Sequence, residues 1–294
     1  MKEKGAAPAW LMEELRQARR GRGKGYIQET GDLLARLDLM TVCDSARCPN
    51  RGECYSHHTA TFLILGDVCT RGCTFCAVRC GRPEGPPDPG EPDRLAQAVS
   101  LLNLTHVVIT SVTRDDLTDG GARHYAHVVR TLRRSCPGVK VELLIPDFQG
   151  SRESLLTVLE AGPDILAHNV ETVPRLYRSV RRGADYSRSL ALLKWAKLQQ
   201  PDLITKSGFM LGLGETGDEI KTVLCDLAET GCDMATIGQY LAPSLAHAPV
   251  DRYALPEEYR MWRLAALDLG FKSVAAGPLV RSSYKASQFF GEIA

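Results

Sequence analysis

Two groups of three cysteines in the first third of the chain constrain this sequence more than any other feature. A structural zinc site or an ordinary ferredoxin cluster takes four protein ligands. Three thiolates in one loop therefore leave one metal position for a different ligand, and two such loops predict two iron–sulfur clusters. The first group has the spacing CX4CX5C and the second CX3CX2C, formed by Cys43, Cys48 and Cys54 and by Cys69, Cys73 and Cys76.

Disulfides and zinc are the alternative interpretations of these cysteines. The even cysteine count fits disulfides, but no N-terminal apolar segment suggests secretion, and a chain of this size does not need cross-links to fold. For zinc, His57 or His58 could complete the first group as a fourth ligand, whereas only Cys80 is near the second. Iron–sulfur clusters account for both groups in the same way and are the favoured interpretation.

Size and charge narrow the possible functions. The chain has 294 residues and a net charge of +1, which suits a single barrel of alternating strands and helices and argues against general nucleic-acid binding. Its apolar runs are too short to span a bilayer. Ten cysteines without an export signal predict a reducing compartment, hence the cytoplasm. The basic stretch 16–24 is interpreted as a solvated, partly disordered arm, or alternatively as a docking patch for an acidic protein.

After a Pro- and Gly-rich linker at 81–92, short apolar runs alternate with helical patterns. This alternation predicts βα units and a parallel sheet, and about six units make a partial (β/α)6 barrel of the TIM type. Asp93 and Ser151 are expected as N-caps, and Gly162, Gly231 and Gly270 as C-caps. The expected strands are 61–65, 106–112, 140–145, 165–169, 205–211, 234–239 and 273–276. The expected helices are 93–102, 121–135, 151–160, 187–198, 218–229 and 256–269.

Polar residues follow these expected strands at their carboxyl ends, which is where parallel barrels build active sites. The second cysteine group follows the first strand. The other residues in such positions are Ser111, Thr113, Arg114 and Asp115, then Asp147, then His168, Asn169 and Glu171, then Gly212, Gly214 and Glu215, and finally Gln239 and Tyr240.

The segment CTRGCTFC, from Cys69 to Cys76, resembles the cysteine loop of the radical S-adenosylmethionine (SAM) enzymes. The segment from Gly208 to Glu215 is similar to their GxIxGxxE pattern, with Met210 in the Ile position. The resemblance implies that the second cysteine group holds a [4Fe–4S] cluster whose open iron binds the amino and carboxylate groups of SAM. It also implies cofactor contacts from Met210 and Gly212, and we expect further contacts from Ser111, Thr113, Asn169 and Glu171.

Nearly the whole chain, from about Trp10 onward, resembles a sulfur-inserting branch of that family. The segments that carry this likeness are CDSARCPNRGEC, SVTRDDLTDGGARHY, PDFQG, HNVETVPRLYRSVR, GLGET, TIGQY and RSSYKA. The resemblance implies a partial barrel over 59–272, an N-terminal extension with an auxiliary cluster loop over 1–58, and a closing tail over 273–294. It implies insertion of two sulfur atoms, at C6 and C8, into an octanoyl chain held on a lysine of a carrier protein.

The same resemblance implies ligands and partners. Cys43, Cys48 and Cys54 would hold a second [4Fe–4S] cluster, with a fourth ligand from Ser283, or from Ser282 as the alternative. The implied partners are octanoylated lipoyl carrier domains, such as acyltransferase subunits of 2-oxoacid dehydrogenases and the glycine cleavage H protein, and an electron donor such as ferredoxin or flavodoxin. Three alternatives stay open: another dual-cluster enzyme of the superfamily (a biotin synthase or a methylthiotransferase), an iron–sulfur electron-transfer protein, and a zinc protein.

Overall fold

The computed structural model describes residues 7–19, 24–46, 48–56, 60–284 and 286. The chain divides into two compact units. The amino-terminal unit consists of residues 18–71 and 77–167, and the carboxyl-terminal unit of residues 1–17, 72–76 and 168–294. His57 and His58, the candidate zinc ligands, lie outside the described residues.

The amino-terminal unit is built on a mostly parallel sheet of apolar strands. β2 pairs antiparallel with β1 and parallel with β5, which continues to β6 and β7 with Ile64 opposite Ser111 and Thr110 opposite Leu144. These strands are buried along most of their length, as is usual for parallel sheets that helices cover. The strands are β1 (Met40–Thr41), β2 (Thr61–Ile64), β5 (His106–Ser111), β6 (Lys140–Leu144) and β7 (Ile165–Ala167), and a separate small ladder joins β3 (Val68–Cys69) to β4 (Arg79–Cys80).

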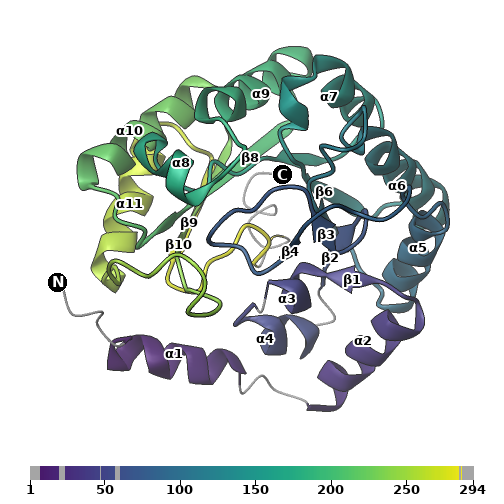
Figure 1. Cartoon of the computed structure of the whole chain (residues 1–294), viewed down its shortest axis with the longest axis horizontal. Coiled ribbons are helices and arrows are strands. Elements are labelled where there is room, and N and C mark those ends of the chain that lie inside the picture. Colours follow the sequence, from purple (N-terminus) through teal and green to yellow (C-terminus); the bar gives the residue numbers. More distant parts are fainter. Residues whose placement is uncertain (1–6, 20–23, 47, 57–59, 285, 287–294) are drawn as a thin grey trace. The chain divides into compact units, whose positions relative to one another are not determined.

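Helices α5, α6 and α7 cover the outer side of this sheet (Figure 1). The apolar face of α6 supplies Tyr125, Val129 and Leu132, which are fully buried. The helices and turns of this unit are α2 (Lys24–Arg36), α3 (Val42–Ser45), α4 (Arg51–Ser56), α5 (Glu91–Leu101), α6 (Ala122–Ser135), η1 (Phe148–Gly150) and α7 (Arg152–Leu159). Most of α1 (Ala9–Arg19) belongs to the carboxyl-terminal unit.

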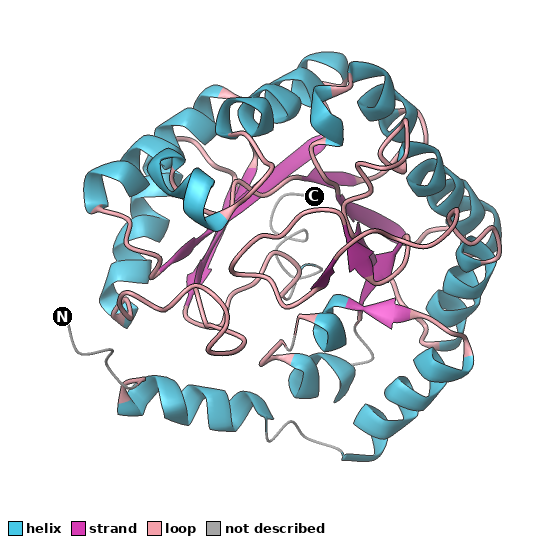
Figure 2. Ribbon diagram, in the orientation of Figure 1, coloured by secondary structure: helices cyan, strands magenta, loops and turns pink. Residues whose placement is uncertain are grey.

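The carboxyl-terminal unit repeats the same arrangement with parallel strands inside and helices outside (Figure 2). Its strands run in register, with Met210 opposite Gly238 and Ile237 opposite Ala276. Its strands are β8 (Ile204–Leu211), β9 (Met234–Gln239) and β10 (Ser273–Gly277). Its helices and turns are η2 (Pro174–Leu176), α8 (Tyr177–Val180), α9 (Tyr186–Gln199), α10 (Gly217–Glu229) and α11 (Pro256–Asp268).

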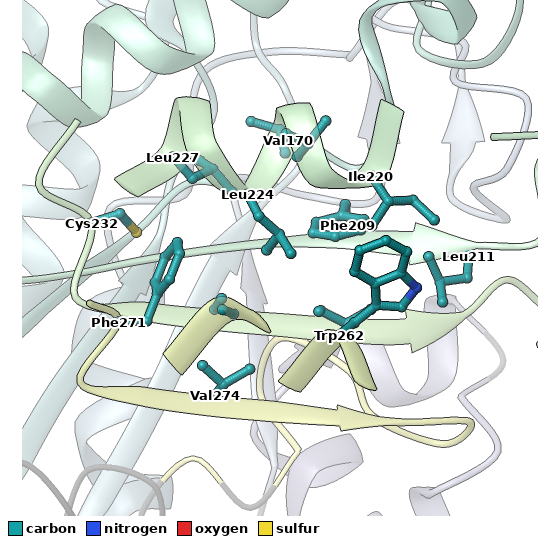
Figure 3. Packing of buried hydrophobic residues seen from close by; sticks show 14 of the residues in the cluster. Val170, Phe209, Leu211, Ile220, Leu224, Leu227, Cys232, Trp262, Phe271 and Val274 are labelled. Atoms are coloured by element: carbon teal, nitrogen blue, oxygen red, sulfur yellow. The ribbon is translucent and has the colours of Figure 1, made fainter. Parts of the chain in front are cut away.

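One hydrophobic cluster joins these strands to α10 and α11 (Figure 3). Leu224 and Leu227 of α10 are fully buried, and Leu224 lies beside Phe209 of β8. Trp262 of α11 and Val274 of β10 close the other side. Each buried aliphatic side chain of this kind contributes roughly 1.5–3 kcal/mol by leaving water, so this core sets the spacing of the strands.

The alternation predicted from the sequence is confirmed, because each expected strand and helix exists within a few residues of its expected bounds. Ser151 caps α7 as predicted. The glycines expected as C-caps, Gly162, Gly231 and Gly270, have left-handed φ values of 76°, 78° and 98°. The N-cap predicted at Asp93 is wrong, because α5 starts two residues earlier with a proline in its first turn, and Asp93 lies inside that turn.

The basic stretch 16–24 is more ordered than the sequence suggested. Arg16 lies in α1 with an exposed side chain and Lys24 begins α2, so the two ends of the stretch are helical and the prediction of partial disorder concerns only the residues between them. Arg20 and Arg22 fall outside the described residues. Among the helices that the structure describes, none has the length and apolar character needed to cross a membrane.

Asp233 ties together the amino ends of the strands in the carboxyl-terminal unit. Its carboxylate accepts hydrogen bonds from the Nζ atoms of Lys197 and Lys272, both at 2.7 Å, and from the Thr205 amide at 2.8 Å. Burial alone would raise the Asp233 pKa, but these donors hold that pKa below its ordinary value of 3.8. A depressed pKa in the folded state means that the ionised carboxylate stabilises the fold at neutral pH.

We expect Asp233→Asn to lower the free energy of unfolding by about 2–4 kcal/mol at pH 7, because the buried carboxylate that pairs with Lys197 and Lys272 is lost. The stabilisation is present above the ordinary pKa and is lost as the pH falls through the depressed one, so the difference from wild type should shrink below about pH 4. Urea unfolding of the iron-free protein at several pH values measures this. The exposed Asp202→Asn is the control, and a pH-independent difference for Asp233→Asn would contradict the account.

Candidate active site

The first cysteine group lies on two short helices of the amino-terminal unit. Cys43 is in α3, Cys54 is in α4, and Cys48 lies in the turn between them. The Cys48 amide donates to the Cys43 carbonyl at 3.0 Å, and the Cys54 amide donates to the Asn50 carbonyl at 2.9 Å. The backbone thus folds all three cysteines into one compact loop.

The Cys43 thiol is 6% exposed, and this burial raises its pKa to about 11, with smaller contributions from Cys48 and Asp44. A backbone hydrogen bond from Thr61 acts in the opposite direction. With no cation bound, this thiol is protonated at neutral pH. Metal binding requires the thiolate, so a metal ion must displace the proton here.

The second cysteine group begins at the end of β3. Cys69 Sγ accepts two backbone hydrogen bonds, from Arg71 and Thr113, both at 3.4 Å. The Thr113 carbonyl accepts from the amide and the hydroxyl of Thr70, at 3.0 Å each. Thr113 was predicted as a side-chain contact of a cofactor, and its backbone has a further role as a brace for the loop that carries Cys69.

Arg71, between the first two cysteines of this group, is held by two acidic residues. Its Nε and Nη2 atoms donate to Asp115 at 2.7 and 2.9 Å, and Nη2 also donates to Asp147 at 2.6 Å. The Arg71 and Asp147 side chains are 7% and 0% exposed. Burial alone would lower the Arg71 pKa, but the two carboxylates raise it. This buried network fixes the loop to the ends of β5 and β6.

The rest of the cysteine loop belongs to the carboxyl-terminal unit and is braced there. The amide of Thr74 donates to the Val180 carbonyl at 2.9 Å, and the Thr74 carbonyl accepts from the Ala248 amide at 2.8 Å. His247 Nε2 lies 3.1 Å from the Cys76 carbonyl oxygen. Segments far apart in the sequence therefore hold the backbone on both sides of Cys73 and Cys76.

Phe75, the aromatic residue before the last cysteine, packs against a small hydrophobic cluster that includes Val180, Met210 and Tyr240. A cavity of about 560 Å3 lies beside it, and its lining includes Thr74, Val180 and Leu213. This volume is in the range of about 300–1,000 Å3 that small-molecule sites occupy.

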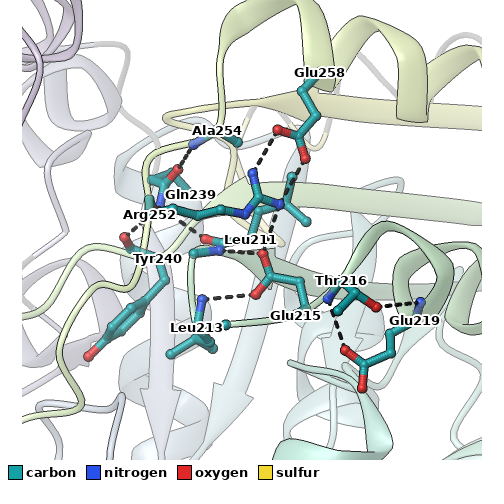
Figure 4. Close-up of polar contacts among 12 residues, drawn as sticks. Leu211, Leu213, Glu215, Thr216, Glu219, Gln239, Tyr240, Arg252, Ala254 and Glu258 are labelled. Atoms are coloured by element: carbon teal, nitrogen blue, oxygen red, sulfur yellow. Dashed lines mark hydrogen bonds and ion pairs between the residues drawn. The ribbon is translucent and has the colours of Figure 1, made fainter. Parts of the chain in front are cut away.

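The glycine-rich turn after β8 is held by Glu215 (Figure 4). The Glu215 carboxylate accepts from the amides of Gly212 and Leu213 at 2.7 and 2.9 Å and pairs with Arg252 at 3.1 Å. Arg252 also forms a two-bonded ion pair with Glu258. Gly212 has φ 103° and would overlap the Arg252 carbonyl if it carried a Cβ atom. Only glycine fits this turn.

Gln239, at the end of β9, was grouped with the functional residues on sequence grounds, and the structure gives it a supporting role. Its amide nitrogen donates to the carbonyls of Leu211, Tyr240 and Arg252 at 3.0–3.1 Å. Its oxygen accepts from the Tyr259 hydroxyl and the Ala254 amide, both at 3.0 Å. Because the side chain is fully buried and its hydrogen-bonding capacity is used within the protein, it positions the neighbouring segments.

Asn169 and Glu171 follow β7 and contact each other. Asn169 Nδ2 donates to Glu171 Oε1 at 3.0 Å and to the Ser282 hydroxyl at 2.8 Å. The buried Asn169 Oδ1 atom has no hydrogen-bond partner among the described residues. Glu171 adopts φ 64°, and burial raises its pKa, against the opposite effects of Arg181 and Asn169. An unsatisfied buried acceptor at a strand end marks a place where a ligand can bind.

Ser111 shows the same feature in the amino-terminal unit. It is the last residue of β5, and its buried Oγ atom has no hydrogen-bond partner among the described residues. A buried hydroxyl without a partner is costly unless a ligand completes it. The hydroxyl at this strand end is therefore available for a polar ligand.

The C-terminal tail packs closely on β9. A Cβ atom on Gly238 would overlap the Val280 carbonyl, so a glycine is needed where the tail passes. The Tyr284 amide donates to the Arg281 carbonyl at 3.0 Å and closes a turn that contains Ser282 and Ser283. The Ser282 hydroxyl accepts from Asn169, whereas the Ser283 carbonyl accepts from Ala286.

The remaining four cysteines lie outside the two cysteine loops, although one of them pairs with a loop cysteine. Cys80 is exposed and is paired in register with Cys69 across the β3–β4 ladder. Cys232 is buried, which raises its pKa to about 12. None of the ten cysteines, all of which are described, forms a disulfide.

No three His, Cys, Asp or Glu side chains converge on a single-ion site within the described parts of the chain. A four-iron cluster does not require such convergence, because each thiolate binds a different iron. Each cysteine loop offers three thiolates that fit a four-iron cluster, and in each unit one buried polar atom without a partner, of Ser111 and of Asn169, fits a polar ligand.

Comparison with known proteins decides the family. Residues 63–227 match the Radical SAM superfamily. Lipoyl synthase from Caldicellulosiruptor saccharolyticus is 54% identical over 262 residues, which cover 89% of this chain and 92% of the relative. Lipoyl synthase from Laribacter hongkongensis is 49% identical over 294 residues, covering 100% of this chain and 91% of the relative.

The chain belongs to the lipoyl synthase family of radical SAM enzymes. Family membership gives it SAM and [4Fe–4S] clusters as cofactors and confirms the α/β fold with a mostly parallel sheet. The crystal structure of methylornithine synthase (PylB) has the same fold, with a TM-score of 0.54 at 15% identity over 92% of this chain and 83% of that one. The partial-barrel fold class and the resemblance inferred from the sequence are thereby confirmed.

Arg71 lies in the second cysteine loop of this lipoyl synthase family member, and the sequence alone did not predict a role for it. Arg71→Met leaves the carboxylates of Asp115 and Asp147 near each other without their cation. We therefore expect the free energy of unfolding to fall by about 3–5 kcal/mol. Chemical denaturation of the iron-free protein measures this without interference from cluster loss. Arg123→Met, an arginine that is 82% exposed, is the control. A loss below about 0.5 kcal/mol for Arg71→Met would contradict the bracing role, since that is the size of ordinary surface effects.

Proposed function

We propose that this chain inserts two sulfur atoms, at C6 and C8, into an octanoyl group held on the lysine of a lipoyl carrier domain. The observation that carries this proposal is the pair of cysteine loops with three thiolates each, braced by different parts of the protein. Membership in the lipoyl synthase family supports the same reaction. No observation favours a zinc protein or a simple electron carrier over it.

Cys69, Cys73 and Cys76 would hold the cluster that binds SAM. When bound, the cluster and SAM together supply a 5′-deoxyadenosyl radical, which can remove a hydrogen atom from an unactivated carbon. The protein provides position and shielding. Asn169 and Glu171 would contact the polar end of SAM, with Ser111 and Thr113 at another strand end. Met210 and Gly212 would lie along the adenine.

Cys43, Cys48 and Cys54 would hold the auxiliary cluster, with Ser283 as its fourth ligand. The resemblance of the tail to the RSSY motif of the family supports Ser283 for the ligand role, and Ser282, whose hydroxyl accepts a hydrogen bond from Asn169, is the alternative. A hydroxyl is a harder ligand than a thiolate and matches cluster iron less well. An iron held in this way is a suitable place for the cluster to open and give up sulfur.

The family relationship shows that lipoyl-domain proteins are the substrates, and the finer assignments are proposals. We expect octanoylated domains of 2-oxoacid dehydrogenase acyltransferases and the glycine cleavage H protein to be used. A ferredoxin or flavodoxin would deliver electrons. We also propose the three-part organisation 1–58, 59–272 and 273–294, and a cytoplasmic setting in which the cysteines stay reduced.

The two cysteine groups should separate radical formation from sulfur insertion. After anaerobic reconstitution, Ala in place of Cys69, Cys73 or Cys76 should lower formation of 5′-deoxyadenosine by more than about 100-fold. Ala in place of Cys43, Cys48 or Cys54 should leave that product detectable and stop formation of the dithiolated carrier. The control is Cys225→Ala, on α10. Sulfur insertion that survives loss of the first group would contradict the assignment of the donor.

The two tail serines should also differ. Ser283→Ala is expected to lower sulfur insertion by about 10- to 100-fold, the scale of disturbed metal coordination, while 5′-deoxyadenosine forms at a similar rate. Ser282→Ala removes the hydrogen bond to Asn169 and should weaken SAM binding instead. Single-turnover assays and SAM titration distinguish the two variants. Unchanged sulfur insertion by Ser283→Ala would exclude it as the ligand.

A further inference from the structure

The first cysteine loop is held in shape by polar side chains that are not cluster ligands. The Tyr55 hydroxyl donates to Asp44 Oδ2 at 2.6 Å and lies 2.8 Å from the Thr41 hydroxyl. Thr41 Oγ1 lies 2.8 Å from the same Asp44 oxygen and accepts from the Asp44 amide as the N-cap of α3. The hydroxyl oxygens of Tyr55 and Thr41 and the Oδ2 atom of Asp44 therefore lie within hydrogen-bonding distance of one another.

This network acts next to the ligands themselves. Asp44 follows Cys43 directly in α3, and Tyr55 follows Cys54 directly in α4. The contact between Asp44 and Tyr55 therefore fixes the distance between the helices that carry the first and last cysteines of the group. Cys48 lies between these fixed ends, with its amide bonded to the Cys43 carbonyl.

The network is anchored to the rest of the amino-terminal unit. Thr41 is the last residue of β1 and is paired with Phe62 of β2, so the sheet holds one end. Thr30 of α2 donates to the Tyr55 carbonyl at 3.3 Å and holds the other. Thr30, Thr41 and Tyr55 are only 1–2% exposed.

A cation completes the arrangement from the solvent side. Arg51 forms an ion pair with Asp44, and its guanidinium carbon lies 6.0 Å from the centroid of the Tyr55 ring. The side chains of Arg51 and Asp44 are about half exposed. The Arg51 guanidinium thus adds a third side-chain donor to the Asp44 carboxylate, beside the hydroxyls of Thr41 and Tyr55.

We propose that Thr41, Asp44, Arg51 and Tyr55 form a clamp that keeps the first cysteine loop in its ligand-holding conformation without iron. The proposal rests on the proposed function, because a cluster that supplies sulfur is consumed and must be replaced. Its residues are positioning residues, since they act through the adjacent cysteines. A loop that lost its shape with the cluster would have to be ordered again before each reloading, at a cost in conformational entropy. The clamp removes that step.

The clamp is tested by hydrogen exchange of the iron-free wild-type protein. The amides of Cys48 and Cys54 should be protected without metal, because their hydrogen bonds belong to the clamped loop. Tyr55→Phe removes the shared hydroxyl and should speed their exchange about tenfold or more. Unprotected amides in the iron-free wild type, or equal exchange in Tyr55→Phe, would overturn the proposal.

A second variant and a matched control make the result specific. Thr41→Val keeps the shape of the side chain but loses its hydroxyl, and it should raise the exchange of the same two amides. Tyr186→Phe removes an equivalent tyrosine–aspartate hydrogen bond, 2.8 Å long, from the carboxyl-terminal unit and should leave them unchanged. Equal acceleration by Tyr186→Phe would show general loosening and overturn the proposal.

Reloading distinguishes this inference from the proposed function. In a background with Cys69, Cys73 and Cys76 changed to Ala, the clamped loop should take up about four irons, and Tyr55→Phe should slow uptake about tenfold. Equal uptake rates with and without the Tyr55 hydroxyl would overturn the clamp. If this background binds no iron while the Cys48 and Cys54 amides remain protected, the assignment of the first cysteine group as cluster ligands is wrong. The clamp would still be supported by that result.

Discussion

A four-iron cluster needs four ligands, and each cysteine loop of this chain offers three thiolates. The open position at the CX3CX2C loop suits a cofactor that must bind and dissociate. We propose a weaker protein ligand, a serine of the tail, for the open position at the CX4CX5C loop. The buried polar atoms of Ser111 and Asn169 have no hydrogen-bond partner among the described residues, and each is available to a polar ligand.

The two loops are braced in different ways, and the difference matches their tasks. The loop with Cys69 is tied to distant parts of the chain, through Arg71 with Asp147 and through His247 with Cys76. Such long-range contacts fix a reaction centre relative to the strands around it. The loop with Cys43 is held by a side-chain network that spans only 14 residues, Thr41 to Tyr55, so we propose that it keeps its shape when its metal content changes.

The fold was largely predictable because its signals are local. β9 was predicted with its observed bounds, since a buried apolar run lies between a helix C-cap glycine and a polar turn. The helices α1 to α4 were missed; α3 and α4 have only four and six residues, and helices this short depend on packing rather than on a periodic pattern. In the site, motif spacing predicted the cysteines and a place after a strand predicted Asn169, whereas Arg71 was missed because its partner Asp147 is 76 residues away. Gln239 was grouped with functional residues, and only its hydrogen bonds revealed that it supports the fold.

Mössbauer spectroscopy of the anaerobically loaded protein, enriched in 57Fe, tests the incomplete thiolate coordination most directly. The account predicts about eight irons per chain, with one iron of each cluster distinct from its three neighbours. Addition of SAM should change the distinct iron of the cluster on Cys69, Cys73 and Cys76 and leave the other cluster unchanged. Spectra in which all irons of either cluster show uniform thiolate coordination, with no response to SAM, would contradict it.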